Sequence, residues 1–250
     1  GYDCMNDKKR IVMTKLNNLC RNFLYKYGTD FYACSKIAGL WMFPKRIVSS
    51  NKFRVINNAV DVDKFAFSPT KREDMRRELN LSDKLVVGHI GNFVYQKNHG
   101  FLIDTFNELH KIDPNACLLL LGDGVLFESI KQKVDELGLS ENVIFTGRVS
   151  NANDYLQAMD IFVLPSNFEG LGIVAVEAQA SGLKCVFSDR VPEEAILTEN
   201  CVSLKINGVN DAKIWAEKIY NTDFTGRTDQ TDIIIAKGYS LKKQNLNMLV

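Results

Sequence analysis

The stretch PSNFEGLGIVAVEAQASGLKCVFS, residues 165–188, decides the fold that we predict. A short apolar strand, residues 160–165, runs into a Gly-x-Gly turn, and a helix of small residues follows the turn. A strand, a glycine turn and a helix N-terminus form an arrangement that holds phosphate groups through backbone amides. We therefore expect the amides of Gly172, Ile173 and Val174 to face an anion.

Two carboxylates lie on either side of this turn. Glu169 precedes it, and Glu177 follows eight residues later in the predicted helix, so both would flank the anion. Carboxylates accept hydrogen bonds, and sugar hydroxyls donate them. A diphosphate with a sugar at each end is a nucleotide sugar, and the segment predicts a site for a ligand of that class.

From Asp83 onward, strand-like and helix-like patterns alternate. Strands are predicted at 85–90, 116–121, 142–145, 160–165, 184–187 and 202–204, and helices at 98–110, 125–137, 153–159, 173–181 and 211–220. This alternation predicts an α/β fold, with a Rossmann-like, doubly wound parallel sheet covered by helices on both faces. Ligands of such sheets bind at the carboxyl ends of the strands, and the motifs of this chain follow those ends.

The composition is that of a globular protein and excludes several classes. The 250 residues are 46% hydrophobic, and 31 Lys and Arg balance 30 Asp and Glu. A net charge of +1 gives no reason to expect nucleic acid as a partner. No apolar run approaches the roughly 18 residues of a membrane span, and the polar start is unlike a signal peptide. The six cysteines lack regular spacing, which favours buried, reduced thiols in a cytosolic protein.

The segment from Glu169 to Glu177 resembles the E-x₇-E signature of retaining glycosyltransferases with the GT-B fold, in the group assigned to family four. Five segments resemble, in order, the bacterial capsular and exopolysaccharide branch of that family: 33–43, 56–61, 96–99, 120–124 and 177–182. The resemblance covers nearly the whole chain, and it implies that the sheet is the C-terminal half of a GT-B fold, beside a partial N-terminal α/β remnant.

The resemblance also implies how the chain is divided. It implies a remnant of the N-terminal, acceptor-side domain (1–56), a linker and first helix (57–82), a nucleotide-sugar-binding Rossmann-like domain (83–235) and a C-terminal helix that returns to the N-terminal domain (236–250). It further implies that a longer N-terminal domain precedes Gly1. We therefore expect the chain to be a fragment that binds the donor and is inactive alone.

Three side chains carry the expected chemistry. The resemblance assigns Glu177 to the ribose hydroxyls of the donor, and it assigns Glu169 to the donor sugar or to charge at the anomeric carbon. Lys97 follows a strand and a turn, where a compact charge on a flexible stem suits a diphosphate. A partly exposed helix glutamate, a glutamate at a helix N-terminus and a solvated loop lysine are the ordinary alternatives.

Other residues complete the predicted donor site. Asn92 stands near the place where the family usually has an arginine, and its uncharged amide weakens the expected cationic clamp on the diphosphate. Gly122 would let the backbone approach a nucleobase, and the resemblance implies that the base is recognised near Arg148 and Val149. The predicted donor-binding residues are Glu177, Gly170, Leu171, Gly172, Ile173, Val174, Asn92, Arg148, Val149 and Gly122, and the predicted catalytic residues are Glu169 and Lys97.

We expect no metal and no cofactor other than the nucleotide sugar as co-substrate. Asp61 and Asp63 form a pair that holds a divalent metal in a different glycosyltransferase fold, but here they lie in the presumed linker. Of the three scattered histidines, His99 lies near the phosphate site and could contact the residues that bind the phosphate, but a surface or capping role is expected for it.

The expected reaction moves a sugar to an acceptor hydroxyl with retention, in capsular, exopolysaccharide or other cell-surface glycan synthesis. The partners would be a nucleotide-sugar donor and a glycan or lipid-linked acceptor. The basic amphipathic helix over 8–27 either contacts the inner face of the cell membrane peripherally, from the cytoplasm, or covers a sheet. A donor-binding module without catalysis stays open, whereas the turn at 91–96 lacks the glycines of a dinucleotide oxidoreductase.

Overall fold

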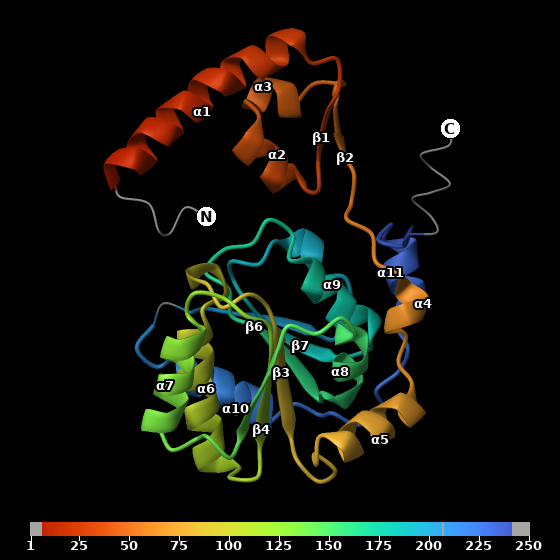
Figure 1. Ribbon diagram of the computed structural model, residues 1–250. Coiled ribbons are helices and arrows are strands. Elements are labelled where there is room, and N and C mark those ends of the chain that lie inside the picture. Colours follow the sequence, from red (N-terminus) through yellow and green to blue (C-terminus); the bar gives the residue numbers. More distant parts are fainter. Residues whose placement is uncertain (1–6, 207, 242–250) are drawn as a thin grey trace. The chain divides into compact units, whose positions relative to one another are not determined.

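The computed structural model describes residues 7–206 and 208–241, and the chain forms two compact units, Gly1–Asn58 and Ala59–Val250 (Figure 1). The first unit contains helix α1 (Asp7–Tyr27), strand β1 (Phe31–Ala33), helices α2 (Lys36–Met42) and α3 (Lys45–Val48) and strand β2 (Phe53–Val55). The two strands pair in parallel. The ring of Phe43 packs against those of Phe31 and Phe53, with centroids 5.2 and 6.2 Å apart. This small α/β unit leaves large side chains such as Trp41 exposed.

The second unit is built on a six-stranded parallel sheet in the order β5-β4-β3-β6-β7-β8. Its strands are β3 (Val86–Ile90), β4 (Cys117–Leu121), β5 (Val143–Gly147), β6 (Ile161–Leu164), β7 (Lys184–Ser188) and β8 (Cys201–Leu204). Its α-helices are α4 (Val62–Phe65), α5 (Pro69–Glu78), α6 (His99–Ile112), α7 (Phe127–Glu136), α8 (Ala152–Ala158), α9 (Ile173–Ala180), α10 (Asp211–Tyr220) and α11 (Thr231–Ala236), and the short 3₁₀ helices are η1 (Tyr95–Lys97) and η2 (Glu193–Ala195). The predicted doubly wound α/β sheet is confirmed, and its order reverses at β3, between β4 and β6.

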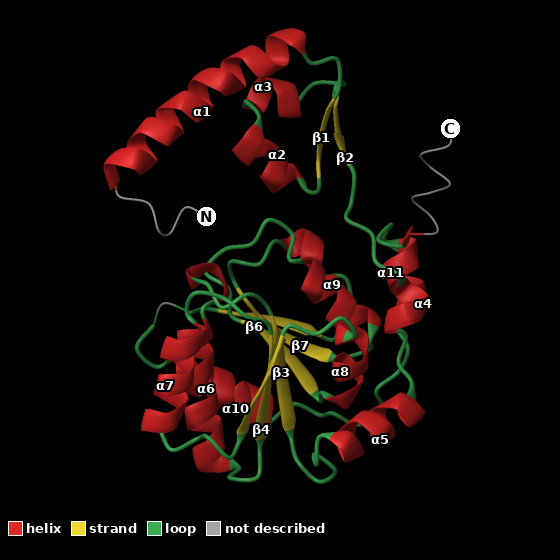
Figure 2. Cartoon of the chain, in the orientation of Figure 1, coloured by secondary structure: helices red, strands yellow, loops and turns green. Residues whose placement is uncertain are grey.

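Strands β4 and β6 are apolar and buried along their whole length because both faces of the sheet are covered (Figure 2). Successive side chains of a strand point to opposite faces. In β6, Ile161 and Val163 therefore pack with α6, α7 and α10, whereas Phe162 and Leu164 pack with α4, α5, α8, α9 and α11. Trp215 of α10 is fully buried, and its indole N–H donates to the carbonyl of Lys205 at 2.7 Å.

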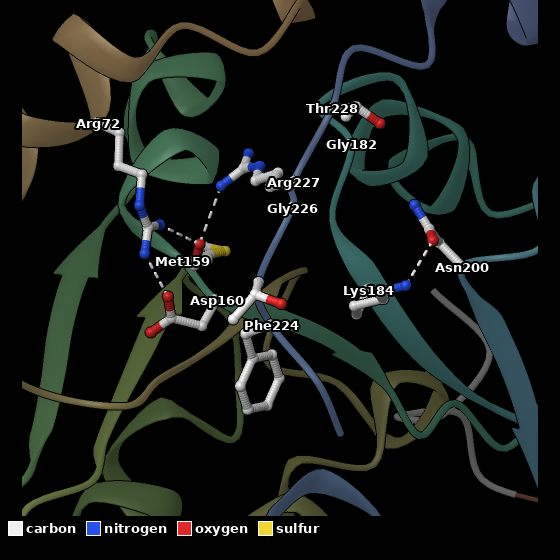
Figure 3. Close-up of a pocket in the computed structure, with 11 residues that line it drawn as sticks. Arg72, Met159, Asp160, Gly182, Lys184, Asn200, Phe224, Gly226, Arg227 and Thr228 are labelled. Atoms are coloured by element: carbon white, nitrogen blue, oxygen red, sulfur yellow. Dashed lines mark hydrogen bonds and ion pairs between the residues drawn. The ribbon is translucent and has the colours of Figure 1, made fainter. Parts of the chain in front are cut away.

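Arg72 and Arg227 bind the C-terminal end of helix α8 at the amino end of the sheet (Figure 3). Arg227 donates to the carbonyls of Leu156, Gln157 and Met159, at 3.0–3.1 Å, and Arg72 also reaches the carbonyl of Met159. These carbonyls lie at the C-terminal end of the helix, where they have no partner in the helix and attract positive charge. A cavity of about 80 Å³ lies beside them, and Arg72, Asp160 and Arg227 in its lining are already engaged in these contacts.

The short helices α3, α4 and α11 were not predicted. The segment expected to be a linker contains α4, and Val60 beside it forms a parallel bridge with Ser240. The predicted C-terminal helix falls largely on residues 242–250, which lie outside the described residues. Across the part of the chain that the structure describes, no helix is both long and apolar enough to cross a membrane.

Candidate functional site

One cavity of about 590 Å³ opens at the carboxyl ends of the central strands, beside the point where the strand order reverses. This volume lies within the range of small-molecule sites, about 300–1,000 Å³. Every residue predicted for the donor site or for catalysis lines it: Asn92, Lys97, Gly122, Arg148, Val149, Glu169, Gly170, Leu171, Gly172, Ile173, Val174 and Glu177. Asp61 and Asp63 are absent from its lining.

The glycine turn places a helix N-terminus against this cavity. Gly172 adopts a left-handed conformation (φ 73°), and α9 begins at the next residue. The amide of Ala175 donates to the carbonyl of Gly172 at 2.8 Å, which closes the first helical turn. Helix geometry leaves the amides of Ile173 and Val174 without a partner inside the helix, and the macrodipole adds partial positive charge there. The turn can therefore bind an anion.

Glu169 is held in a nearly buried cluster of donors. Its side chain is only 5% exposed, and Lys97 Nζ lies 2.6 Å from its Oε1. The hydroxyl of Ser166 donates to the same oxygen at 2.7 Å, and Gln96 Nε2 donates to Oε2 at 3.1 Å. Lys97 and Glu169 were expected to contact separate groups of the donor, whereas in the structure they pair with each other.

Gln96 and Ser166 were missed as members of this cluster. Each lies within three residues of a predicted site residue, on a segment that follows a strand, and this proximity was the available signal. The two segments are also joined directly. Asn98 occupies the N-cap position of α6 in a left-handed conformation (φ 55°), but its side chain donates to the carbonyl of Pro165 at 3.2 Å instead of capping the helix.

Glu177 lies on α9, in the lining of the cavity. Burial raises the pKa of its carboxyl, and the positive charge of Lys64 on α4 opposes that rise. A carboxyl that is partly desolvated accepts strong hydrogen bonds when donors reach it, because its solvation by water is incomplete. Lys64 was not among the predicted site residues, since its helix was not foreseen.

The glycines at residues 122 and 124 shape the loop that carries Asn92. A side chain at Gly122 (φ 136°) would clash with the carbonyl oxygen of Gly91, and one at Gly124 would meet the backbone of Phe93. The amide of Phe93 donates to the carbonyl of Asp123 at 3.0 Å. These glycines thus let two loops pack closely at the rim of the cavity, and approach of a nucleobase at Gly122 stays a prediction.

The expected surface or capping role of His99 is wrong. His99 is 1% exposed and stacks on Phe93 at a centroid distance of 3.9 Å, and its ring lies edge-to-face with the fully buried His89 at 4.7 Å. His89 Nδ1 donates to the carbonyl of Val163 at 2.8 Å. Burial, with Lys97 as a second cause, lowers the pKa of His99 to about 4. Burial, and next His99, lower the pKa of His89 well below its usual value.

Comparisons with known proteins agree with this geometry. Residues 71–235 match the model of the family described as "Glycosyl transferases group 1". The chain is 29% identical over 208 residues to EpsF of Bacillus subtilis (strain 168), which is named as a glycosyltransferase. The alignment covers 83% of this chain and 54% of EpsF. It is 29% identical over 207 residues to glycosyltransferase MJ1059 of Methanocaldococcus jannaschii, covering 80% of this chain and 50% of MJ1059.

The chain thus spans about half the length of these curated relatives. Among solved structures, Alr3699/HepE of Anabaena in complex with UDP-glucose superposes with a TM-score of 0.78 at 20% identity, covering 93% of this chain and 66% of HepE. That likeness supports a GT-B assignment of the fold. Because the family model covers more than half of its residues, the chain belongs to the glycosyl transferases group 1 family.

Proposed function

We propose that the cavity binds the nucleotide-sugar donor of a glycosyltransferase that moves a sugar to an acceptor hydroxyl with retention at the anomeric carbon. The convergence of all predicted donor-site residues on one cavity carries the proposal. They come from segments up to 85 residues apart, and they combine a helix N-terminus, a lysine and two carboxylates. This combination suits a ligand with a diphosphate between two hydroxyl-rich groups.

In the proposed mechanism, negative charge grows on the leaving diphosphate as its bond to the anomeric carbon breaks. The amides of Ile173 and Val174 and the ammonium of Lys97 stabilise that charge. An ammonium carries three N–H groups, so Lys97 can contact Glu169 and a phosphate oxygen together. Glu169 then acts mainly by holding Lys97 in place, because three donors already occupy its carboxylate.

Glu177 is proposed to accept hydrogen bonds from the ribose hydroxyls. Arg148 and Val149 lie in the same lining and are proposed to face the base. Asn92 offers an amide N–H to the diphosphate without charge, so Lys97 is the main cation of the clamp. We propose that no metal and no resident cofactor takes part, since Lys97 and the helix amides supply the positive charge.

The wider setting is also part of the proposal. We place the reaction in capsular, exopolysaccharide or other cell-surface glycan synthesis, with a glycan or lipid-linked acceptor. The protein would act in the cytoplasm, with peripheral contact to the inner face of the cell membrane through α1. The unit Gly1–Asn58 is proposed to belong to the acceptor side, and this chain alone is proposed to bind donor without efficient transfer.

Calorimetric titration of the chain with UDP, GDP and ADP tests the donor site. UDP comes first because the similar HepE structure holds UDP-glucose. We expect one nucleotide to bind saturably, and Glu177→Ala and Lys97→Ala to weaken it at least about tenfold, which is about 1.4 kcal/mol.

The charge-matched controls are Glu128→Ala and Lys131→Ala, which alter exposed residues of α7 outside the cavity. They should leave the affinity unchanged, and circular dichroism would verify that every variant is folded. The proposal would be contradicted if all four variants bound the nucleotide with the same affinity, or if the folded wild-type chain bound no nucleotide.

A further inference from the structure

Two cysteines lie side by side at the edge of the sheet, and neither of them lines the cavity. Cys185 of β7 and Cys201 of β8 are direct partners in the parallel register. Neighbouring strands lie about 4.8 Å apart, and paired residues point to the same face of a sheet. Disulfides join residues whose Cα atoms are about 4.4–6.8 Å apart, and the spacing of neighbouring strands falls within that range.

The two thiols differ in their surroundings. Cys185 is 1% exposed, and its thiol donates to the carbonyl of Leu183 at 3.5 Å, whereas Cys201 is half-buried. The hydroxyl of Thr198 lies 3.7 Å from the sulfur of Cys201. The neighbouring Cys185 thiol is the first cause that lowers the pKa of Cys201, burial opposes it and Thr198 adds to it, whereas burial raises the pKa of Cys185. Cys201 is the more exposed of the two thiols and is therefore the one that a small reagent can reach.

We propose that Cys185 and Cys201 form a dithiol–disulfide site that hydroperoxides oxidise. The Cys201 thiolate attacks the O–O bond of the peroxide and becomes a sulfenic acid, and the departing hydroxide takes up a proton to leave as water. The sulfur of Cys185 then attacks the sulfur of Cys201, loses its proton and releases a second water as the S–S bond forms. Two thiols are oxidised, and one hydrogen peroxide is reduced to two waters.

A disulfide between Cys185 and Cys201 would link the edge strand β8 covalently to β7, and it would close residues 186–200 between them into a loop. That segment is already tied to α9, because Gln179 donates to the carbonyl of Ala195 and accepts from the amides of Leu197 and Thr198. The oxidation site therefore adjoins the helix whose N-terminus faces the cavity. It is independent of sugar transfer and stands whether or not the proposed donor binds.

Oxidation of the chain by hydrogen peroxide, followed by alkylation under denaturing conditions and peptide mass analysis, tests the site. Cys4, Cys20 and Cys34 are first replaced by serine so that they cannot compete. We expect a peptide pair that links Cys185 to Cys201, lighter by two hydrogen atoms than the reduced pair, and its loss on treatment with dithiothreitol. Cys117 of β4 is the internal control. Burial raises its pKa to about 11, so it should stay a thiol.

The single variants Cys185→Ser and Cys201→Ser sharpen this test. Cys185→Ser should leave Cys201 as a sulfenic acid that dimedone traps, whereas Cys201→Ser should leave Cys185 reduced. Melting curves before and after oxidation check that each variant is folded, and the linked form should melt at a higher temperature. The proposal is overturned if both thiols of the folded chain remain open to alkylation, or if Cys201 is oxidised further while Cys185 stays reduced.

Discussion

Replacing His99 by phenylalanine should remove a large part of the acid sensitivity of this fold. The imidazole of His99 is 1% exposed, stacks on Phe93, and has no hydrogen-bond partner for either ring nitrogen among the residues that the structure describes. A phenyl ring can keep the stacking contact and cannot be protonated. At neutral pH we therefore expect the variant to be about as stable as the wild-type chain, or more stable.

The magnitude follows from the pKa of His99, which is about 4 in the folded chain and about 6.5 when unfolded. Between these values the unfolded state binds more protons, so the free energy of unfolding falls as pH falls. The contribution of the neutral His99 imidazole to the free energy of unfolding is complete above pH 6.5 and is lost as the pH drops toward 4. For a single group this amounts to about 2 kcal/mol at pH 5, and about 3 kcal/mol at pH 4. His89, whose pKa is also lowered, adds to the slope in both proteins.

Urea unfolding of the wild-type chain and His99→Phe at pH 8, 6.5, 5.5 and 5 measures this difference. The stability of the variant relative to the wild-type chain should rise by about 2 kcal/mol from pH 8 to pH 5. His110→Phe, on the same helix α6, is the control for the introduction of a phenylalanine into this helix. Parallel curves for His99→Phe and the wild-type chain over this range would refute the assigned burial of a neutral imidazole.

Three further substitutions test the packing around the sheet by urea unfolding at pH 7.5. Arg227→Ala removes the guanidinium that binds three carbonyls at the end of α8 and the carbonyl of Ser181 after α9, and it should cost about 2–4 kcal/mol, so a loss below 1 kcal/mol would exclude this role. Gly88→Ala forces a methyl group against the buried side chain of Met159 and should cost about 1–3 kcal/mol, whereas a neutral result would show that Met159 moves aside freely. Gln179→Leu keeps the volume but leaves a buried carbonyl and two amides unpaired, and we expect a loss of about 2–3 kcal/mol, while unchanged stability would mean that water replaces the side chain.

The sequence predicted the sheet well because its signals are local. The apolar runs of β4 and β6, and the glycine turn at Gly172, each lie within a few consecutive residues. Parallel strands bring their carboxyl ends to one edge, so the motifs that follow β3 and β6 could be expected to meet without any knowledge of long-range contacts. The predicted site residues were expected to lie together for the same reason, and they line one cavity.

The contacts inside that cavity could not be predicted in the same way. The ion pair between Lys97 and Glu169 joins loops 72 residues apart, and only the packing of those loops decides whether the two groups meet each other or solvent. The histidines look scattered in the sequence, yet β3 and the start of α6 bring His89 and His99 into ring contact. Short helices such as α4 have too few residues to show a helical period, so Lys64 was not connected with the site.

The central claim is that the N-terminus of α9 holds the diphosphate of the donor, and amide chemical shifts test it most directly. A ¹⁵N-labelled chain would be titrated with the nucleotide that calorimetry identifies, and the resonances of Gly172, Ile173 and Val174 followed. We expect the resonances of these amides to shift together and to saturate at the calorimetric affinity. A nucleotide that binds while these amides stay unchanged, or that shifts mainly the residues around Arg72 and Asp160 at the opposite end of the sheet, would contradict it.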